Sequence, residues 1–175
     1  MDVPTPVNPI VFRRAMGRWA TGVSVVTTRG MERDFGLTVN SFASVSLRPP
    51  SVLVSIGDES DSAPVIRASG TFGVSVLRDD QAEVSTRMAR VGQGEAKFEG
   101  VRFHRSPSGI AWLDGALFSI ECRVTGELRA SDHTLFLGEV LSIQEGGDGL
   151  PLLFYHSDYA RSAGPETVRL PPPRR

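Results

Sequence analysis

Residues 36–56 read GLTVNSFASVSLRPPSVLVSI, a run in which small hydroxyl residues alternate with apolar ones and two prolines precede a β-branched segment. Short β-branched segments of this kind are typical of strands. Similar segments recur along the chain, at 22–28, 72–77, 118–125, 135–143 and 152–155. Residues 118–125 alternate in polarity as a half-buried strand does, whereas 135–143 is apolar on both sides and predicts a more buried strand.

Three helical segments are expected around these strands. The first begins at Asn8 and Pro9, a side-chain cap followed by a residue suited to a first helical turn, and ends at Gly22. The second spans 63–68, and the third begins after 79–80. Apolar residues of the first segment recur at helical spacing and are interpreted as core packing; they are Val11, Phe12, Ala15, Met16 and Trp19.

The remaining segments define the domain organisation. Residues 1–8 are expected to form an extended arm, 9–162 a single domain, and 163–175 a mobile tail that ends in PPPRR. Within the domain, 91–114 has weak periodicity and is expected to be a long loop. About seven strands with few helices predict a mainly β fold and favour a closed or nearly closed barrel, because closure removes exposed strand edges. A sandwich fits the same pattern.

Composition limits the possible partners and chemistry. The chain has 175 residues, 19 basic and 20 acidic side chains and a formal charge of −1, so no nucleic acid or membrane partner is expected. Cys122 is the only cysteine and lies on the apolar face of its strand, as a small core residue. The three histidines are widely spread, so no metal site is predicted. The N-terminal residues do not resemble a signal peptide, which predicts a cytoplasmic protein.

The stretch 36–50 also has the composition of a binding wall. A flat, partly apolar cofactor with polar edges needs small hydroxyl and amide groups beside apolar contacts such as Val39 and Phe42. The candidate polar groups are Thr38, Asn40, Ser41, Ser44 and Ser46. The same alternation also fits an exposed strand that binds no ligand.

Residues 57–64, GDESDSAP, place Ser60 and Ser62 at the expected start of a helix. Free N–H groups and the positive end of the helix dipole make such a position suitable for a phosphate. An ordinary N-cap is the alternative. Neighbouring carboxylates would repel a phosphate unless they point away; they are Asp58, Glu59 and Asp61.

Residues 131–134, SDHT, precede a predicted strand and contain His133. A histidine titrates near neutrality, so this side chain has the chemistry to orient a nicotinamide or to help move a proton. The alternative is a surface histidine paired with Asp132.

Taken together, these segments resemble the short-chain flavin reductase family, the reductase components of two-component flavin-dependent monooxygenases. The resemblance runs from about Phe12 to Tyr159 and rests on segments in a fixed order: FRRAMGRWATGVSVVTT, GLTVNSFASVSLRPPSVLVSI, SGTFGVSVL, KFEGV, LDGALFSIECRV, SDHTLFLGEV and PLLFYHSDY. It implies an FMN-binding split β-barrel with a few short peripheral helices, working as a homodimer with flavin sites near the subunit interface. The implied reaction is reduction of FMN or FAD by NADH or NADPH, with the reduced flavin passed to a partner monooxygenase.

The resemblance also implies roles for individual residues. Those near the flavin ring and ribityl chain are Thr38, Val39, Asn40 and Ser41, with Ser44, Val45 and Ser46 nearby. Those at the phosphate are Ser60 and Ser62. Other positions that match family segments near the flavin are Lys97, Phe98 and Tyr159, and His133 matches a motif associated with nicotinamide docking.

Two departures from the family pattern stand out. Ser131 replaces the glycine of the motif that contains His133, and Ser157 replaces a glycine before Tyr159. Family habit favours NADH over NADPH, but the choice between FMN and FAD stays open. The alternatives are another enzyme of the same barrel group, either pyridoxamine-phosphate-oxidase-like or a quinone reductase, and a non-catalytic FMN-binding module.

Overall fold

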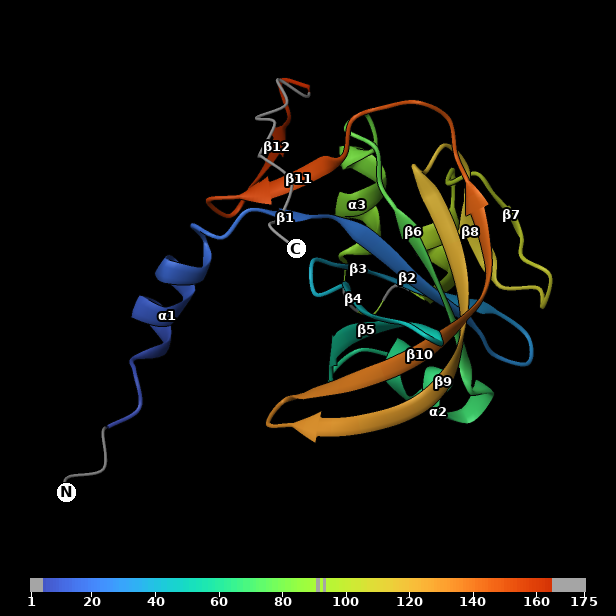
Figure 1. The fold of residues 1–175 in the computed structure, drawn as a ribbon, viewed down its shortest axis with the longest axis horizontal. Coiled ribbons are helices and arrows are strands. Elements are labelled where there is room, and N and C mark those ends of the chain that lie inside the picture. The colour runs from blue at the N-terminus through green and yellow to red at the C-terminus, as the bar shows by residue number, and fades with distance from the viewer. Residues whose placement is uncertain (1–4, 91, 93, 165–175) are drawn as a thin grey trace, which may run out of the picture.

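The computed structural model describes residues 5–90, 92 and 94–164, arranged as in Figure 1. Residues 1–4 of the predicted arm and 165–175 of the predicted tail lie outside these residues. The helical segments are α1 (Pro9–Met16), α2 (Ser62–Ser69), α3 (Ala82–Met88) and the 3-10 helix η1 (Gly94–Phe98). The strands are β1 (Thr21–Gly22), β2 (Ser24–Arg29), β3 (Asp34–Val39), β4 (Ala43–Leu47), β5 (Pro50–Gly57), β6 (Thr71–Val76), β7 (Phe103–Arg105), β8 (Ala111–Leu113), β9 (Phe118–Ala130), β10 (His133–Glu145), β11 (Leu152–Tyr155) and β12 (Asp158–Arg161).

Seven strands form the main sheet, in the order β3-β2-β6-β9-β10-β5-β4, with every neighbouring pair antiparallel. The sheet curls into a split barrel, and the end of β3 is tied to β5 by Ser41. The Ser41 hydroxyl donates to the Ser55 carbonyl at 2.7 Å and accepts from the Ser55 N–H at 3.1 Å. The predicted mainly β fold is confirmed, and each strand predicted from the sequence overlaps an observed one.

Apolar side chains of the main sheet fill the barrel. The buried set includes Val54, Ile56, Phe72, Cys122 and Phe136. A Cβ at Gly138 would come within 2.5 Å of the Phe72 ring and 2.9 Å of the Cys122 Cβ, so this strand position has room only for glycine. Burial raises the pKa of the Cys122 thiol to about 12, with a smaller effect from Glu121. The interpretation of Cys122 as a core residue is confirmed.

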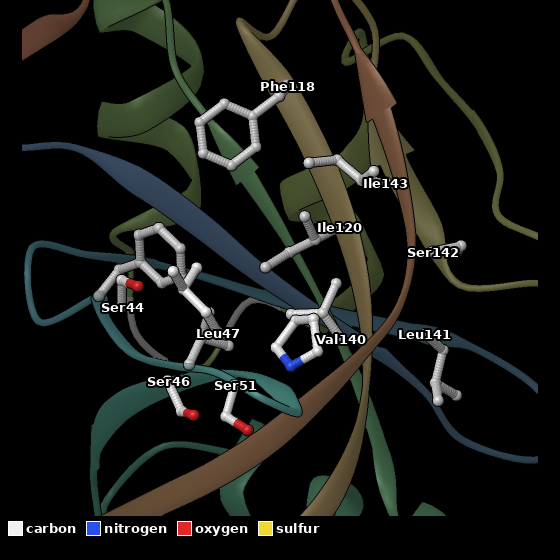
Figure 2. Close-up of a pocket in the computed structure, with 13 residues that line it drawn as sticks. Ser44, Ser46, Leu47, Ser51, Phe118, Ile120, Val140, Leu141, Ser142 and Ile143 are labelled. Carbon is white, nitrogen blue, oxygen red and sulfur yellow. The ribbon is translucent and has the colours of Figure 1, made fainter.

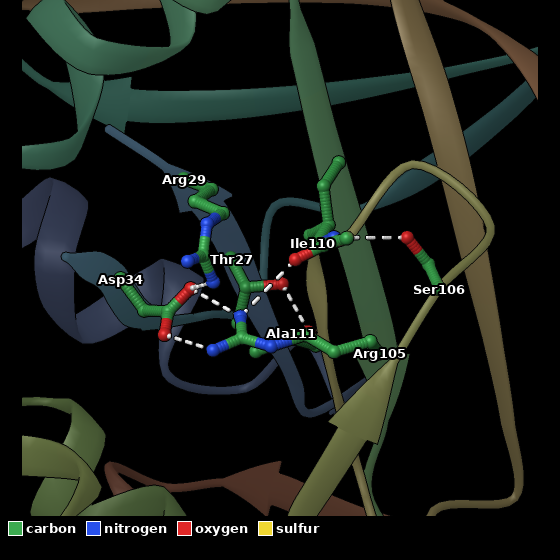
Figure 3. Close-up of polar contacts among 8 residues, drawn as sticks. Thr27, Arg29, Asp34, Arg105, Ser106, Ile110 and Ala111 are labelled. Atoms are coloured by element: carbon green, nitrogen blue, oxygen red, sulfur yellow. Dashed lines mark hydrogen bonds and ion pairs between the residues drawn. The ribbon is translucent and has the colours of Figure 1, made fainter. Parts of the chain in front are cut away.

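Polar contacts fasten a small hairpin, β7–β8, to the outside of the barrel (Figure 3). The Arg105 guanidinium donates two hydrogen bonds to the Asp34 carboxylate, at 2.6 and 2.9 Å. The Thr27 hydroxyl donates to the Ala111 carbonyl at 2.6 Å. The prediction of a long loop at 91–114 is therefore wrong, because these three-residue strands are stabilised by contacts with distant residues and carry no local periodicity.

The first helix differs from its prediction. It ends at Met16, with Gly17 as its C-cap, and it extends away from the barrel in Figure 1. None of its residues is buried, and Trp19, just beyond it, is 71% exposed. The predicted start at Asn8 is confirmed, since the Asn8 side chain accepts from the Ile10 N–H. The predicted core packing is wrong, because the helix is amphipathic but no part of the described chain covers its apolar side.

The other helices and strand β10 also compare with their predictions. The predicted helices at 63–68 and after 79–80 are observed as α2 and α3. Strand β10 is buried only in its first half, and Ile143 near its end is 61% exposed, so the prediction of a buried strand throughout 135–143 is wrong. None of the helices in the described ranges is long and apolar enough to cross a membrane.

Candidate functional site

Two adjoining cavities lie where β3 ends, between the barrel and α3. One, of about 220 Å³, is called the Tyr159 cavity, and the other, of about 230 Å³, the Lys97 cavity. Both are lined by Thr38 and Ala89, so they form one continuous site. Joined, they fall within the usual size of a small-molecule site, which starts at about 300 Å³.

The Tyr159 cavity has apolar and aromatic walls. Its lining residues are Val23, Thr38, Val39, Asn40, Ala89, Phe154 and Tyr159. The phenol of Tyr159 is held by a 2.8 Å hydrogen bond with the Ser85 hydroxyl. The Thr38 hydroxyl donates to the Ser85 carbonyl at 2.6 Å. Ser85 of α3 therefore orients two predicted site residues, and the Thr38 oxygen keeps lone pairs that can accept from a ligand.

The Lys97 cavity is more polar and contains charges of both signs. Its lining residues are Leu37, Thr38, Gly57, Glu59, Ser60, Asp61, Met88, Ala89, Arg90, Gly92 and Lys97. The Lys97 ammonium donates to the Gly36 carbonyl at 3.1 Å. Partial burial lowers the pKa of Lys97, and the nearby Asp61 charge opposes this shift. Lys97 and Arg90 favour an anionic group in this cavity, whereas Glu59 and Asp61 oppose one.

The start of α2 borders the Lys97 cavity, as the sequence predicted. Ser60 lines the cavity, and its hydroxyl accepts from the Ser62 N–H at 3.2 Å. Ser62 is buried at the first position of the helix and does not line the cavity. Of the three acidic residues, Asp58 turns toward Arg129, whereas Glu59 and Asp61 face the cavity. The expected condition that these carboxylates point away from a phosphate is therefore met only by Asp58.

His133 lies at the rim of the same site. It pairs with Gly57 across β10 and β5, and a Cβ on Gly57 would lie 3.8 Å from the His133 Nε2. Its Nδ1 lies 2.8 Å from an Asp132 carboxylate oxygen, and this hydrogen bond lowers the pKa of Asp132. With Nδ1 bonded to a carboxylate, Nε2 is the ring atom left for a ligand. The side chain is 49% exposed, which leaves it accessible.

The stretch 36–50 divides at Ser41. The Ser41 hydroxyl donates one hydrogen bond and accepts one within the fold, and Ser41 does not line either cavity. Ser44 and Ser46 line a separate apolar groove of about 460 Å³, whose residues are drawn in Figure 2, and Val45 is exposed beside it. The predicted wall is thus not continuous within one chain.

The apolar groove crosses β4, β5, β9 and β10. Figure 2 shows Phe118 and Ile143 projecting to the same side of β9 and β10 at one end of it. Its lining residues are Phe42, Ser44, Ser46, Leu47, Pro50, Ser51, Val52, Phe118, Ile120, Val140, Leu141, Ser142 and Ile143. Phe98, a predicted flavin neighbour, instead packs edge-on against Phe103 at a centroid distance of 5.5 Å and lines neither cavity.

Several lining residues have no signal in the sequence. Ala89 and Arg90 follow α3, and Phe154 lies on β11, far from β3 in the chain. Strand β12, which carries Tyr159, was not predicted as a strand. Among the described residues, no cluster of three or more histidine, cysteine, aspartate or glutamate side chains has the arrangement of a metal site.

Comparison with known proteins gives consistent matches. Residues 16–163 match the family model described as flavin reductase like domain. The chain is 40% identical over 161 residues to an NADH-dependent flavin reductase from Rhodococcus, and this match covers 90% of this chain and 89% of that protein. It is 38% identical over 156 residues to the flavin-dependent monooxygenase reductase subunit HsaB from Mycobacterium tuberculosis, covering 87% of this chain and 82% of that protein.

Solved structures share the fold over nearly the whole chain. Flavin reductase PheA2 superposes with a TM-score of 0.81 at 38% identity, covering 90% of this chain and 99% of that one. The NADH:FAD oxidoreductase SgcE6 from Streptomyces globisporus, in complex with NAD and FAD fragments, superposes with a TM-score of 0.86 at 32% identity. That match covers 95% of this chain and 99% of the other.

Proposed function

The chain belongs to the flavin reductase-like family, and from this premise we propose that it is an NAD(P)H:flavin oxidoreductase. It passes a hydride from a reduced nicotinamide to FMN or FAD. NADH is the expected donor, because the Rhodococcus relative and SgcE6 are both named for it.

The observation that carries this proposal is the two-part site at the end of β3. An apolar, aromatic cavity adjoins a polar one that contains a half-buried ammonium, and a flavin nucleotide has the same division between ring system and phosphate. The residues proposed for the ring and ribityl chain are Thr38, Val39, Asn40 and Tyr159. Those proposed for the phosphate end are Ser60 and Lys97, and the Ser62 N–H holds the Ser60 hydroxyl in place.

The proposed reaction requires no acid, base or nucleophile from the side chains. The flavin accepts the hydride, and the protein's tasks are to bind, to orient and to exclude competing contacts. Ser85 holds Tyr159 and Thr38 in place, so the walls of the Tyr159 cavity are preorganised. His133 presents Nε2 at the rim, where it would orient the nicotinamide against the flavin.

We also propose a homodimer formed through the apolar groove. The groove leaves Leu47 and Ile143 exposed to water, at 85% and 61%, and α1 exposes a second apolar face. An apolar area of this kind on a folded chain is typical of a protein interface. Ser44, Val45 and Ser46 border the groove, so dimerisation would place them at the subunit boundary, where the family resemblance places flavin sites.

The proposed recipient of the reduced flavin is a flavin-dependent monooxygenase, since HsaB is named as a reductase subunit of one. Reduced flavin that leaves the site would serve that partner as a diffusing product. The substrate that is oxygenated would bind to that monooxygenase and not to this chain.

The first test is oxidation of NADH by the purified chain, followed by the loss of reduced-nicotinamide absorbance with and without added FMN or FAD. We expect turnover that saturates with flavin, and the ratio of the two kcat/KM values ranks FMN against FAD. Flavin binding by fluorescence without turnover from either nicotinamide would instead identify a binding module.

A further inference from the structure

The turn that carries His133 is a tight hairpin between two long strands. Ala130 pairs with His133, so only Ser131 and Asp132 lie in the loop, and Ser131 has a φ of 58°. Two-residue hairpins at the end of long strands can rock about their last paired residues unless another element holds them. The position of His133 therefore depends on what the turn is attached to.

Asp58 attaches the turn to the barrel through three contacts. Its N–H donates to the Asp132 carbonyl at 2.9 Å. One carboxylate oxygen accepts from the Thr134 hydroxyl at 3.1 Å, and the other lies 3.2 Å from an Arg129 guanidinium nitrogen. Arg129 and Thr134 face each other across β9 and β10, so one carboxylate holds both members of a cross-strand pair beside the turn.

The same segment of chain lines the candidate flavin site. Gly57, immediately before Asp58, lines the Lys97 cavity and lies under the His133 ring, and the three residues after Asp58 also line that cavity. Asp58 itself points away from the cavity. A single stretch of five residues, 57–61, therefore both forms part of the cavity wall and contacts the turn.

We propose that Asp58 is a positioning residue, which fixes the β9–β10 turn so that His133 is held over the flavin site. This proposal rests on the proposed function for its kinetic consequence, but the attachment of the turn can be measured without it. Asp58 touches neither cavity, so its role is exerted through His133.

Three variants separate the contacts. Asp58→Ala removes both side-chain contacts, Asp58→Asn keeps an acceptor for Thr134 but loses the charge beside Arg129, and Thr134→Val removes one partner. Glu139→Gln is the matched control, because Glu139 pairs with Arg123 across the same two strands, at 2.6 Å and far from the turn. All four are measured as full-length purified protein.

The first readout is hydrogen exchange of the amides at 129–135, which needs no activity. We expect faster exchange there in Asp58→Ala, an intermediate rate in Asp58→Asn, and the wild-type rate in Glu139→Gln. Wild-type exchange at 129–135 in Asp58→Ala would overturn the proposal, whatever the protein catalyses.

The second readout is a double-mutant cycle with His133→Ala. Alone, Asp58→Ala should raise the KM for NADH about tenfold, the scale of losing one hydrogen bond to a charged group, with flavin affinity within about twofold of wild type. In a His133→Ala background, Asp58→Ala should add no further change. Additive effects would overturn the proposal even with faster exchange. A wild type that oxidises no NADH would refute the proposed function, and hydrogen exchange alone would then decide the role of Asp58.

Discussion

The candidate site at the end of β3 and the apolar groove both include residues of 36–50, but they differ in the polarity and the charge of the side chains that line them. The site at the end of β3 combines aromatic walls with an ammonium, an arginine and two carboxylates, and Ser85 of α3 holds Thr38 and Tyr159. The groove across β4 and β10 has about the same volume as the joined site, but it is lined by apolar side chains and serines and by no charged side chain. Only three residues separate Ser44, at the groove, from Asn40, at the site.

This difference shows how one sequence pattern can serve two kinds of recognition. A site with few, fixed polar groups among apolar walls is suited to orienting a small molecule. A broad apolar surface without fixed charges is suited to another protein surface. Because Ser41 turns the chain by bonding to Ser55, residues on its two sides face different partners. The comparison predicts that substitutions on one side leave the function of the other side intact.

The largest expected effect is on assembly. Ile143→Asp places a carboxylate in the groove of each copy, and burying it without a partner would raise the dimer dissociation constant by about 100-fold or more. Sedimentation velocity over a concentration series measures this directly. Leu128→Asp is the matched control, because Leu128 is exposed on β9 but does not line the groove. Equal dissociation by both variants, or a wild type that is monomeric, would contradict an interface at the groove.

The next effect concerns only the site. His133→Ala should raise the KM for NADH about tenfold, which corresponds to about 1.4 kcal/mol, and leave flavin binding unchanged. Steady-state kinetics with NADH and flavin varied separately provide the measurement. His104→Gln is the control, since His104 lies on β7 and lines neither of the two cavities. Unchanged kinetics in His133→Ala would show that the histidine does not orient the nicotinamide.

A smaller effect is expected for Lys97→Met. Removing the ammonium should weaken FMN binding about fivefold, as measured by fluorescence titration. Arg87→Met on α3 is the control, because Arg87 lines neither cavity. An equal loss in both variants would indicate a general charge effect.

Lys97→Met should weaken flavin binding but stabilise the flavin-free protein. The pKa of Lys97 is lower in the folded chain than its ordinary value of 10.5, because burial disfavours the charged form. Its contribution to stability is therefore present above pH 10.5 and is lost as the pH falls through the folded pKa. At neutral pH the ammonium is a net cost, so Lys97→Met should raise the Tm of the flavin-free protein. A lower Tm would mean that the bond to Gly36 outweighs the burial cost.

The features that could be predicted from the sequence are those determined by neighbouring residues. The strand periodicity, the cap at Asn8 and the start of α2 near Ser62 are local features, and all three are observed. The division of 36–50 at Ser41 depends on a contact with Ser55, 14 residues away, and the attachment of β7–β8 depends on Asp34, 71 residues from Arg105. The apolar side of α1 was interpreted as core, because an exposed amphipathic helix and a helix packed on a core have the same periodicity.

The resemblance to a family predicted more than periodicity did, and it was most informative where this chain departs from the family. Ser131 and Ser157 were identified as replacements for glycine, and both have a positive φ, of 58° and 62°. A positive φ is the conformation that glycine adopts without strain. These departures therefore mark strained backbone, at the turn before His133 and at the turn before Tyr159.

The smallest expected effect comes from relieving one of these turns. A left-handed φ costs a residue with a Cβ about 1–2 kcal/mol, whereas glycine loses about 0.5–1 kcal/mol through its freer unfolded state, so relief of strain wins. Ser131→Gly should therefore raise the Tm by about 2–3 °C. Ser131→Ala keeps the Cβ and should leave the Tm unchanged. A lower Tm in Ser131→Ala together with an unchanged Tm in Ser131→Gly would show that the hydroxyl matters rather than the strain.

Because the turn adjoins the site and lies at the far end of β10 from the groove, Ser131→Gly should change the KM for NADH but not the dimer dissociation constant. A change in the dimer dissociation constant as well as in the KM for NADH would show that the site and the apolar groove are coupled through β10.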